Sequence, residues 1–198
     1  ALLCMVMGCT TLGQGFSATA ADSTTAEEEV EINFAKALQM SLYFYDANKC
    51  GSGITGGNLE WRGDCHTEDA AVPLKPMGKD YKGTNLSQEF IDAHRDILDP
   101  DGDGTIDVAG GMHDAGDHVK FCLPGSYAAS TLGWGYYEFR DAYVDSGQQW
   151  HVEDILHWFN DYYLKCTYFD ENGDILAFCY QVGEGDIDHN YWNAPELQ

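Results

Sequence analysis

Two aspartates three positions apart are the residues of this sequence best suited to acid–base chemistry. Asp114 and Asp117 lie in the segment GGMHDAGDHVKFCLP (110–124), with His113 and His118 on either side. Residues three apart in a turn or a first helical turn share a face, so both carboxylates can reach one water molecule. Two like charges this close push their pKa values apart. One carboxylate can then accept a proton while the other orients the water.

The same four side chains allow two other interpretations. The segment is also compatible with a polar loop or with a helix start that uses Asp114 as its N-cap. Alternatively, His113, Asp114, Asp117 and His118 form a catalytic metal site, because these ligand types suit zinc, manganese or iron. A metallohydrolase of that kind would lose its activity reversibly when a chelator is added.

The run GG-x-x-DAGDHVKF-x-LP resembles the signature of glycoside hydrolase family 9, the inverting β-1,4-glucanases that include many cellulases. Two further segments resemble family motifs in the same order: WRGD at 61–64, and Q-V-G-x-G-x-x-D-H-x-x-W at 181–192. The resemblance extends from about Asn33 to the end of the chain. It implies the N-terminal part of a catalytic domain, with a mainly α fold that forms the opening portion of an (α/α)6 barrel with long loops.

The resemblance also implies roles for individual residues in hydrolysing β-1,4-glucosidic bonds of cellulose or related β-glucans. Asp117 would be the general base, Asp114 would share its water, and His189 and Trp192 would contact the sugar. Inversion needs a second carboxyl group about 6.5–9.5 Å from the base. In the family this acid is a Glu well beyond residue 198, so we expect the chain alone to be inactive. A non-catalytic carbohydrate-binding module, with Trp61 and Trp192 as the sugar platform, is the remaining alternative.

Four possible zinc ligands occur near these motifs. Zinc favours four nitrogen or sulfur ligands in a tetrahedron, and Cys50, Cys65, His66 and His113 supply such a set. The resemblance implies a structural zinc beside the catalytic loop, with one ligand immediately before DAGD, where His113 stands. A Cys50–Cys65 disulfide, natural for an exported protein, and free thiols are the alternatives.

The segment DPDGDGTID (99–107) resembles a calcium-binding EF-hand loop. Position 12 of the loop is a glycine where a bidentate Glu belongs, which weakens the match. The sequence therefore leaves calcium binding and a solvated acidic turn as alternatives. Loop positions 1, 3, 5, 6 and 9 are matched by Asp99, Asp101, Asp103, Gly104 and Asp107.

The beginning of the sequence is typical of an exported protein. Residues 1–21 are interpreted as a signal peptide truncated at its start, because an apolar run is followed by an A-x-A pattern at Ala18–Ala20. A lipid anchor on Cys9 at the cell surface is the alternative to secretion. Residues 22–31 form an acidic linker, and residues 32–198 form the catalytic-domain segment.

The chain is strongly acidic, and its apolar residues recur at helical spacing. The chain has 33 Asp and Glu against 10 Lys and Arg, a formal charge of -23, which disfavours nucleic acid and anionic membranes and is compatible with a neutral β-1,4-glucan. Apolar spacing predicts helices over 29–47, over 126–144 with Ser126 as N-cap, and over 149–164. Residues 175–182 are predicted to be extended.

Overall fold

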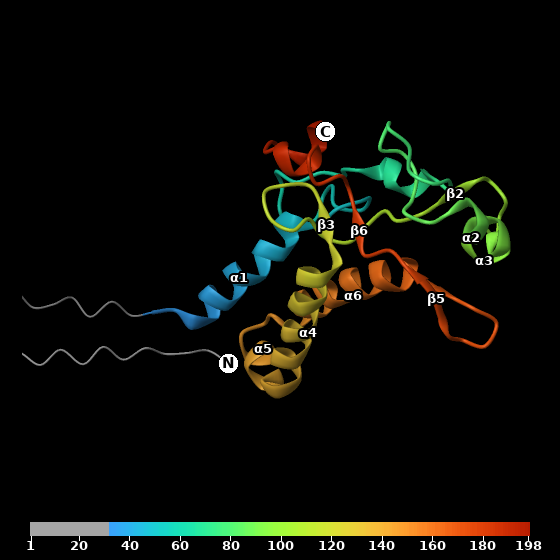
Figure 1. Cartoon of the computed structure of the whole chain (residues 1–198). Helices are drawn as coiled ribbons and strands as arrows, with labels where there is room; N and C mark the ends of the chain where they lie inside the picture. The colour runs from blue at the N-terminus through green and yellow to red at the C-terminus, as the bar shows by residue number, and fades with distance from the viewer. Residues whose placement is uncertain (1–31) are drawn as a thin grey trace, which may run out of the picture. The chain divides into compact units, whose positions relative to one another are not determined.

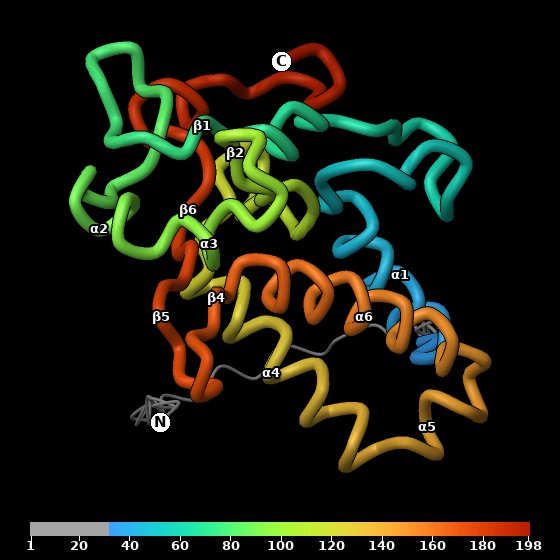
Figure 2. The backbone as a smooth tube through the Cα atoms, turned by 90° about the vertical axis from the view of Figure 1, so that its right-hand side faces the viewer, coloured from blue at the N-terminus to red at the C-terminus, as the bar shows by residue number. Residues whose placement is uncertain are grey.

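Three long helices form the framework of the part of the chain that the structure describes, residues 32–198 of a computed structural model. The predicted signal peptide and linker lie outside these residues. Helix α6 packs against both α1 and α4, so the helices lie side by side (Figures 1 and 2). They correspond to the three predicted helices, with the bounds Phe34–Asn48 for α1, Cys122–Glu138 for α4 and Gln149–Lys165 for α6.

The second predicted helix differs from the structure at its start and in its continuity. Helix α4 begins at Cys122, and Ser126 is not its cap, because the Ser126 hydroxyl donates instead to the Leu123 carbonyl. The helix stops before Phe139, whose φ of -123° is not helical, and α5 (Arg140–Asp145) continues in a new direction (Figure 1). The predicted single helix is therefore two helices.

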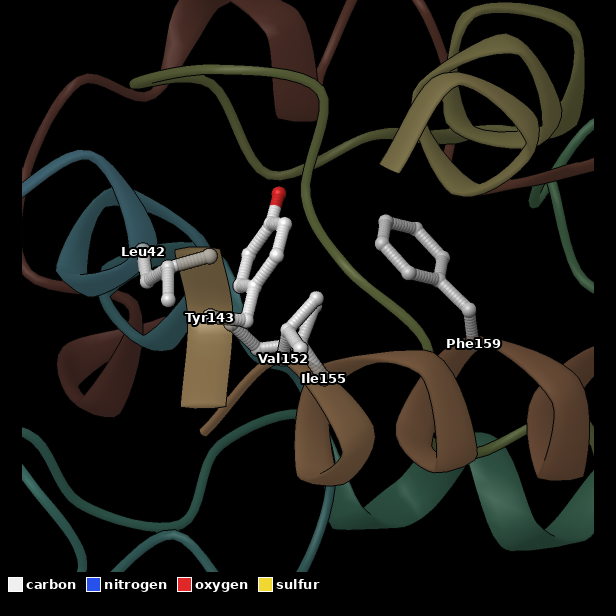
Figure 3. Close-up of a cluster of buried hydrophobic side chains, with 5 residues drawn as sticks. All are labelled: Leu42, Tyr143, Val152, Ile155 and Phe159. Atoms are coloured by element: carbon white, nitrogen blue, oxygen red, sulfur yellow. The ribbon is translucent and has the colours of Figure 1, made fainter. Parts of the chain in front are cut away.

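A cluster of buried apolar side chains joins α1, α5 and α6 (Figure 3). Each fully buried side chain of this size stabilises the fold by roughly 1.5–3 kcal/mol. The spacing in α6 follows the helical repeat, so one face of that helix is turned to the core. The cluster consists of Leu42, Tyr143, Val152, Ile155 and Phe159.

Short antiparallel strand pairs connect the loops to this framework. Pairing of β3 with β6, with Lys120 opposite Val182, brings the two motif segments 110–124 and 181–192 together (Figure 1). The predicted extended segment is divided between β5 and β6. The strand pairs are β1 (Val72–Pro73) with β2 (Thr105–Ile106), β3 (Lys120–Phe121) with β6 (Gln181–Val182), and β4 (Thr167–Phe169) with β5 (Ile175–Phe178).

The remaining helices are short, and one of them, η2, lies within the 181–192 motif. They are α2 (Gln88–Ala93), α3 (Arg95–Leu98), and the 3-10 turns η1 (Thr67–Ala71), η2 (Asp188–Asn190) and η3 (Pro195–Leu197). Within the described residues, none of the helices combines the length and the apolar character needed to cross a bilayer. Helix α4 nevertheless exposes large apolar side chains to solvent, among them Leu123, Tyr127, Trp134 and Tyr137.

Candidate active site

The segment that carries the paired aspartates is a closed loop. The Asp114 N–H donates to the Val119 carbonyl at 3.0 Å, which joins the two ends of the loop. The His113 N–H donates to the Asn48 carbonyl at 2.8 Å, which ties the loop to the C-terminal end of α1. Strand β3 follows immediately, so the loop is held between a helix end and a strand. Both aspartates therefore lie in one closed loop, Asp114 at its first end and Asp117 within it.

The two aspartates have different surroundings. The Asp117 side chain is 2% exposed, and its Oδ2 lies 2.9 Å from His189 Nδ1, within hydrogen-bonding distance. Asp117 Oδ1 accepts no hydrogen bond within the described residues, yet it is not among the side-chain oxygens sealed from solvent. Asp114, in contrast, is exposed. One oxygen of a largely buried carboxylate thus stays free to accept a hydrogen bond.

The surroundings of Asp114 favour its protonated form. Partial burial raises the pKa of Asp114, the nearby charge of Asp117 raises it further, and His189 opposes both effects. Asp114 therefore binds a proton more readily than an isolated aspartate does. A raised pKa at one carboxyl group is expected where a second carboxylate lies close to it.

Trp192 supplies a flat apolar surface beside the loop. Trp192 is 64% exposed, and the centroid of its ring lies 5.8 Å from that of the His189 ring. A Cβ on Gly116, between the two aspartates, would lie 2.9 Å from the Trp192 ring, so only glycine permits this close approach. The pairing of β3 with β6 thus places both predicted sugar-binding residues next to Asp117.

His118 does not face the aspartates. Its Nε2 lies 3.0 Å from the Asn193 carbonyl, and its ring packs against His66, His113 and Tyr191. Within residues 32–198, the side chains His113, Asp114, Asp117 and His118 do not form a group of closely spaced ligand atoms. The arrangement required for the alternative catalytic metal site is not formed.

Lys120 is a buried lysine that the sequence analysis did not identify, and it holds the segment that leads into the loop. Lys120 Nζ donates to the Val108 carbonyl at 2.8 Å and to the Gly110 carbonyl at 3.1 Å. It also forms an ion pair with Asp69 Oδ2 at 2.8 Å, although its side chain is only 2% exposed. The Lys120 ammonium therefore joins η1 to segment 108–110, which precedes the loop that carries Asp114 and Asp117.

Two glutamates of the C-terminal segment, Glu184 within the 181–192 motif and Glu196 after it, form structural contacts. Glu196 Oε1 accepts from Arg62 Nε and from the Gly63 N–H, each at 2.8 Å. Burial alone would raise the pKa of Glu196, but its bond to Arg62 and the Gly63 N–H lower it. Glu184 Oε2 accepts from the N–H groups of Asp186 and Ile187. A carboxylate that holds donors in this way is poorly suited to protonating a leaving group.

The four predicted zinc ligands lie together. One ligand atom from each of Cys50, Cys65, His66 and His113 lies within 4.8 Å of the others. The residues come from the segment after α1, from the two positions after the WRGD motif, and from the loop that carries Asp114 and Asp117. The bridge between Gly51 and Cys65 joins the first two of these segments. Both cysteines are buried free thiols, so the alternative disulfide is not formed in this structure.

The chemistry of this cluster fits a cation. Both ring nitrogens of His66 and Nε2 of His113 are buried without a hydrogen-bond partner in the described part of the chain. His66 also has a φ of 48°, a left-handed conformation that a side chain other than glycine rarely adopts. A hydrogen bond from Cys50 lowers the pKa of the Cys65 thiol, opposed by burial and assisted by His113 and His66. A thiol with a lowered pKa beside imidazole nitrogens that lack partners is a suitable set of ligands for zinc.

Comparisons with known proteins agree with the motifs. The sequence model of glycosyl hydrolase family 9 matches residues 34–198. The chain is 34% identical to Endoglucanase 4 of Bacillus sp. (strain KSM-522) over 84% of its own length and 21% of that protein. The catalytic domain of Clostridium thermocellum CelT is 57% identical, with a TM-score of 0.79, over 84% of this chain and 33% of that one. The cellulase Cel9M of C. cellulolyticum, solved with cellobiose, is 36% identical with a TM-score of 0.59, over 85% of this chain and 31% of that one.

The likeness confirms the expected architecture. The described residues are mainly helical with long loops and correspond to the opening portion of an (α/α)6 barrel. The chain spans about a fifth to a third of the length of the three relatives named above. The exposed apolar face of α4 is consistent with a helix from such a barrel.

Proposed function

The chain belongs to glycosyl hydrolase family 9, and we propose that the protein hydrolyses β-1,4-glucosidic bonds in cellulose or related β-glucans with inversion. The observation that carries the proposal is the match of residues 34–198 to the family, together with a buried Asp117 whose carboxylate is held by His189. Relatives named as endoglucanases and a relative solved with cellobiose support the substrate class.

Asp117 is the proposed general base. A base must be ionised and must be within hydrogen-bonding reach of the proton that it takes. The contact between Asp117 Oδ2 and His189 Nδ1 fixes the carboxylate and leaves Oδ1 to accept a hydrogen bond from water. Asp114, with its raised pKa, serves as a second partner that orients the same water. The proton removed from the attacking water passes to Asp117 as the new C–O bond forms.

The general acid is not assigned to a residue of this chain. Inversion requires a carboxylic acid about 6.5–9.5 Å from the base, on the other side of the scissile bond. Glu184 and Glu196 are occupied by backbone N–H groups and by Arg62, so neither is offered to a leaving oxygen. The acid donates its proton to that oxygen, which leaves with the other half of the glucan.

His189 and Trp192 are the proposed sugar contacts. The exposed Trp192 ring offers a flat face for the C–H surface of a glucose unit, and it lies against Gly116 between the two aspartates. His189 is 56% exposed at its side chain, so its second nitrogen can bond a hydroxyl while Nδ1 holds Asp117. Substrate binding and base orientation thus share one residue.

A structural zinc is proposed at Cys50, Cys65, His66 and His113. These residues would hold the ion through one nitrogen of each imidazole and the sulfur of each cysteine, which would satisfy buried ring nitrogens that now have no partner in the described residues. Because His113 immediately precedes Asp114, the site fixes one end of the catalytic loop. A closed site with four protein ligands leaves no position for water, so its contribution is to stability. We also propose that the protein is secreted, on the basis of the signal-like residues 1–21.

A hybrid enzyme tests the proposal. Residues 34–198 would replace the matching third of the CelT catalytic domain, which supplies the rest of the barrel. We expect this hybrid to hydrolyse a soluble β-1,4-glucan and to release products first as the α-anomer, as seen by proton NMR. The 198-residue chain alone should release none. Hydrolysis by the chain alone, or β-anomeric first products from the hybrid, would contradict the proposal.

A further inference from the structure

Two cysteines lie opposite each other at the base of the hairpin that β4 and β5 form. Helix α6 ends at Lys165 with Cys166 as its C-cap, the hairpin follows, and the chain returns through Cys179 to β6 (Figures 1 and 2). Both residues are free thiols in this structure. We propose that Cys166 and Cys179 form a disulfide under oxidising conditions, and that this bond fixes the strand that leads to the 181–192 motif.

The backbone brings the two cysteines within reach of a disulfide. In the ladder of β4 and β5, Thr167 is opposite Phe178, so the next pair along the ladder is Cys166 and Cys179. The Cys179 N–H donates to the Cys166 carbonyl at 2.9 Å. Residues that are hydrogen-bonded across an antiparallel pair have Cα atoms about 5.5 Å apart. That separation lies within the range that a disulfide spans without movement of the backbone.

The two thiols differ in acidity and in access. Their hydrogen-bonding interaction raises the pKa of Cys166 and lowers that of Cys179, while burial raises the pKa of both. Cys179 is therefore the thiol that ionises more readily. It is also partly exposed, whereas Cys166 is fully buried. Because the thiolate is the attacking group in disulfide exchange, Cys179 is the sulfur that reacts first with an oxidant.

Cys122, the third cysteine of this buried cluster, is engaged elsewhere. Its Sγ donates to the Cys179 carbonyl at 3.2 Å, and burial raises its pKa to about 11. A thiol that is bonded to the backbone and difficult to ionise is a poor nucleophile. Within residues 32–198, the sulfurs of Cys122, Cys166 and Cys179 are not among the sets of ligand atoms that lie within 4.8 Å of one another. The cluster therefore favours a bond between two sulfurs over a metal ion held by three.

The oxidation is an exchange with a small disulfide, for which oxidised glutathione is the probe. The Cys179 thiolate attacks one sulfur of the probe, whose S–S bond breaks, and one glutathione thiolate leaves. Cys166, which loses its proton as it attacks, then displaces the second glutathione thiolate from Cys179. The two cysteine protons pass to the two glutathione thiolates, and two electrons reduce the probe. Disulfides persist in exported proteins, and the secretion proposed above would provide that environment.

The cross-link would join α6 to the segment that carries the sugar contacts. The Cys166 N–H donates to the Tyr162 carbonyl at 2.9 Å, which holds Cys166 on the last turn of α6. Two residues after Cys179 the chain enters β6, whose pairing with β3 positions the 181–192 motif beside the paired aspartates. Closing the loop 166–179 would restrict the unfolded chain and so stabilise the folded one.

Peptide mapping of the 198-residue chain tests the proposal. The chain would be treated with oxidised glutathione in a buffer that contains zinc, alkylated with iodoacetamide and digested with trypsin. No Lys or Arg follows Lys165, so Cys166 and Cys179 stay together on peptide 166–198, while every other cysteine lies on a different peptide. A disulfide between them therefore leaves this peptide without label and lighter by two hydrogens than its reduced form.

Cys179→Ala is the test variant. Cys122→Ala is the matched control, because it removes another thiol of the same cluster and leaves the pair intact. We expect oxidation to form the bond in the parent and in the control, and to raise their Tm, measured by circular dichroism, by roughly 5–10 °C. A reductant should reverse this rise. The test variant should show no rise, and any oxidation of Cys50 and Cys65 would affect all three chains alike.

The peptide masses of the parent decide the pairing even if a variant does not fold. Complete labelling of peptide 166–198 after oxidation of the parent, or a link between Cys179 and Cys122, would overturn the proposal. So would a Tm that does not rise in the oxidised parent, or one that rises equally in Cys179→Ala.

Discussion

Replacing the buried Lys120 by methionine should release the catalytic loop from its support. The change keeps the length of the side chain but removes three contacts: those to the carbonyls of Val108 and Gly110, and that to Asp69 at 2.8 Å. Breaking a buried ion pair by removing one partner costs roughly 3–5 kcal/mol, because the other charge stays uncompensated. That is a large fraction of the 5–15 kcal/mol by which domains are typically stable.

The assay is urea unfolding of the hybrid enzyme, followed by circular dichroism, with turnover measured on the same samples. Lys79→Met is the control, because Lys79 is an exposed lysine on a loop. The double variant Asp69→Leu/Lys120→Met should be more stable than Lys120→Met alone, because removing both partners leaves no unpaired charge. A loss below about 1 kcal/mol for Lys120→Met, or a double variant less stable than the single, would refute the argument that this ion pair anchors the loop.

Three further outcomes follow from the same contacts. Gly116→Ala should displace the Trp192 ring, which would lie 2.9 Å from the new Cβ, and weaken glucan binding by about 2–10-fold in equilibrium binding assays. Cys65→Ser should reduce the zinc content, measured by metal analysis, from about one per chain to a trace, and lower the Tm. Burial alone would raise the pKa of Asp46, but hydrogen bonds from His151, Asn58 and Lys49 lower it below its ordinary 3.8. Its contribution to stability is therefore complete above that pH and lost as the pH falls through the lower folded pKa, so unfolding below about pH 4 should depend on pH more steeply in the parent than in Asp46→Asn.

Local spacing is the basis on which the sequence predicts the centre of the site. Asp114 and Asp117 are three residues apart in a glycine-containing segment, so a turn was bound to bring them together. The periodicity of apolar residues likewise located α1 and α6. The start of α4 was misplaced because Ser126 is a strong capping residue in sequence. Pro124 lies in the first turn, where a missing N–H is tolerated, so the helix can begin earlier.

The supporting charges could not have been predicted in the same way. Lysine, arginine and aspartate are normally exposed, and nothing in their local sequence indicates that Lys120, Arg62 and Asp46 are buried. Their partners are distant: His151 lies 105 positions from Asp46, and Glu196 lies 134 positions from Arg62. Such pairs become visible only when the helices and loops have been placed.

The most direct test of the account is the turnover of Asp117→Asn in the hybrid enzyme, measured together with glucan affinity. If Asp117 is the base that activates water, kcat should fall by about 10²–10⁴-fold while the Kd for a cello-oligosaccharide stays within about twofold. Full turnover in this variant would contradict the role of Asp117. A parent hybrid that binds glucan without hydrolysing it would instead favour a carbohydrate-binding module.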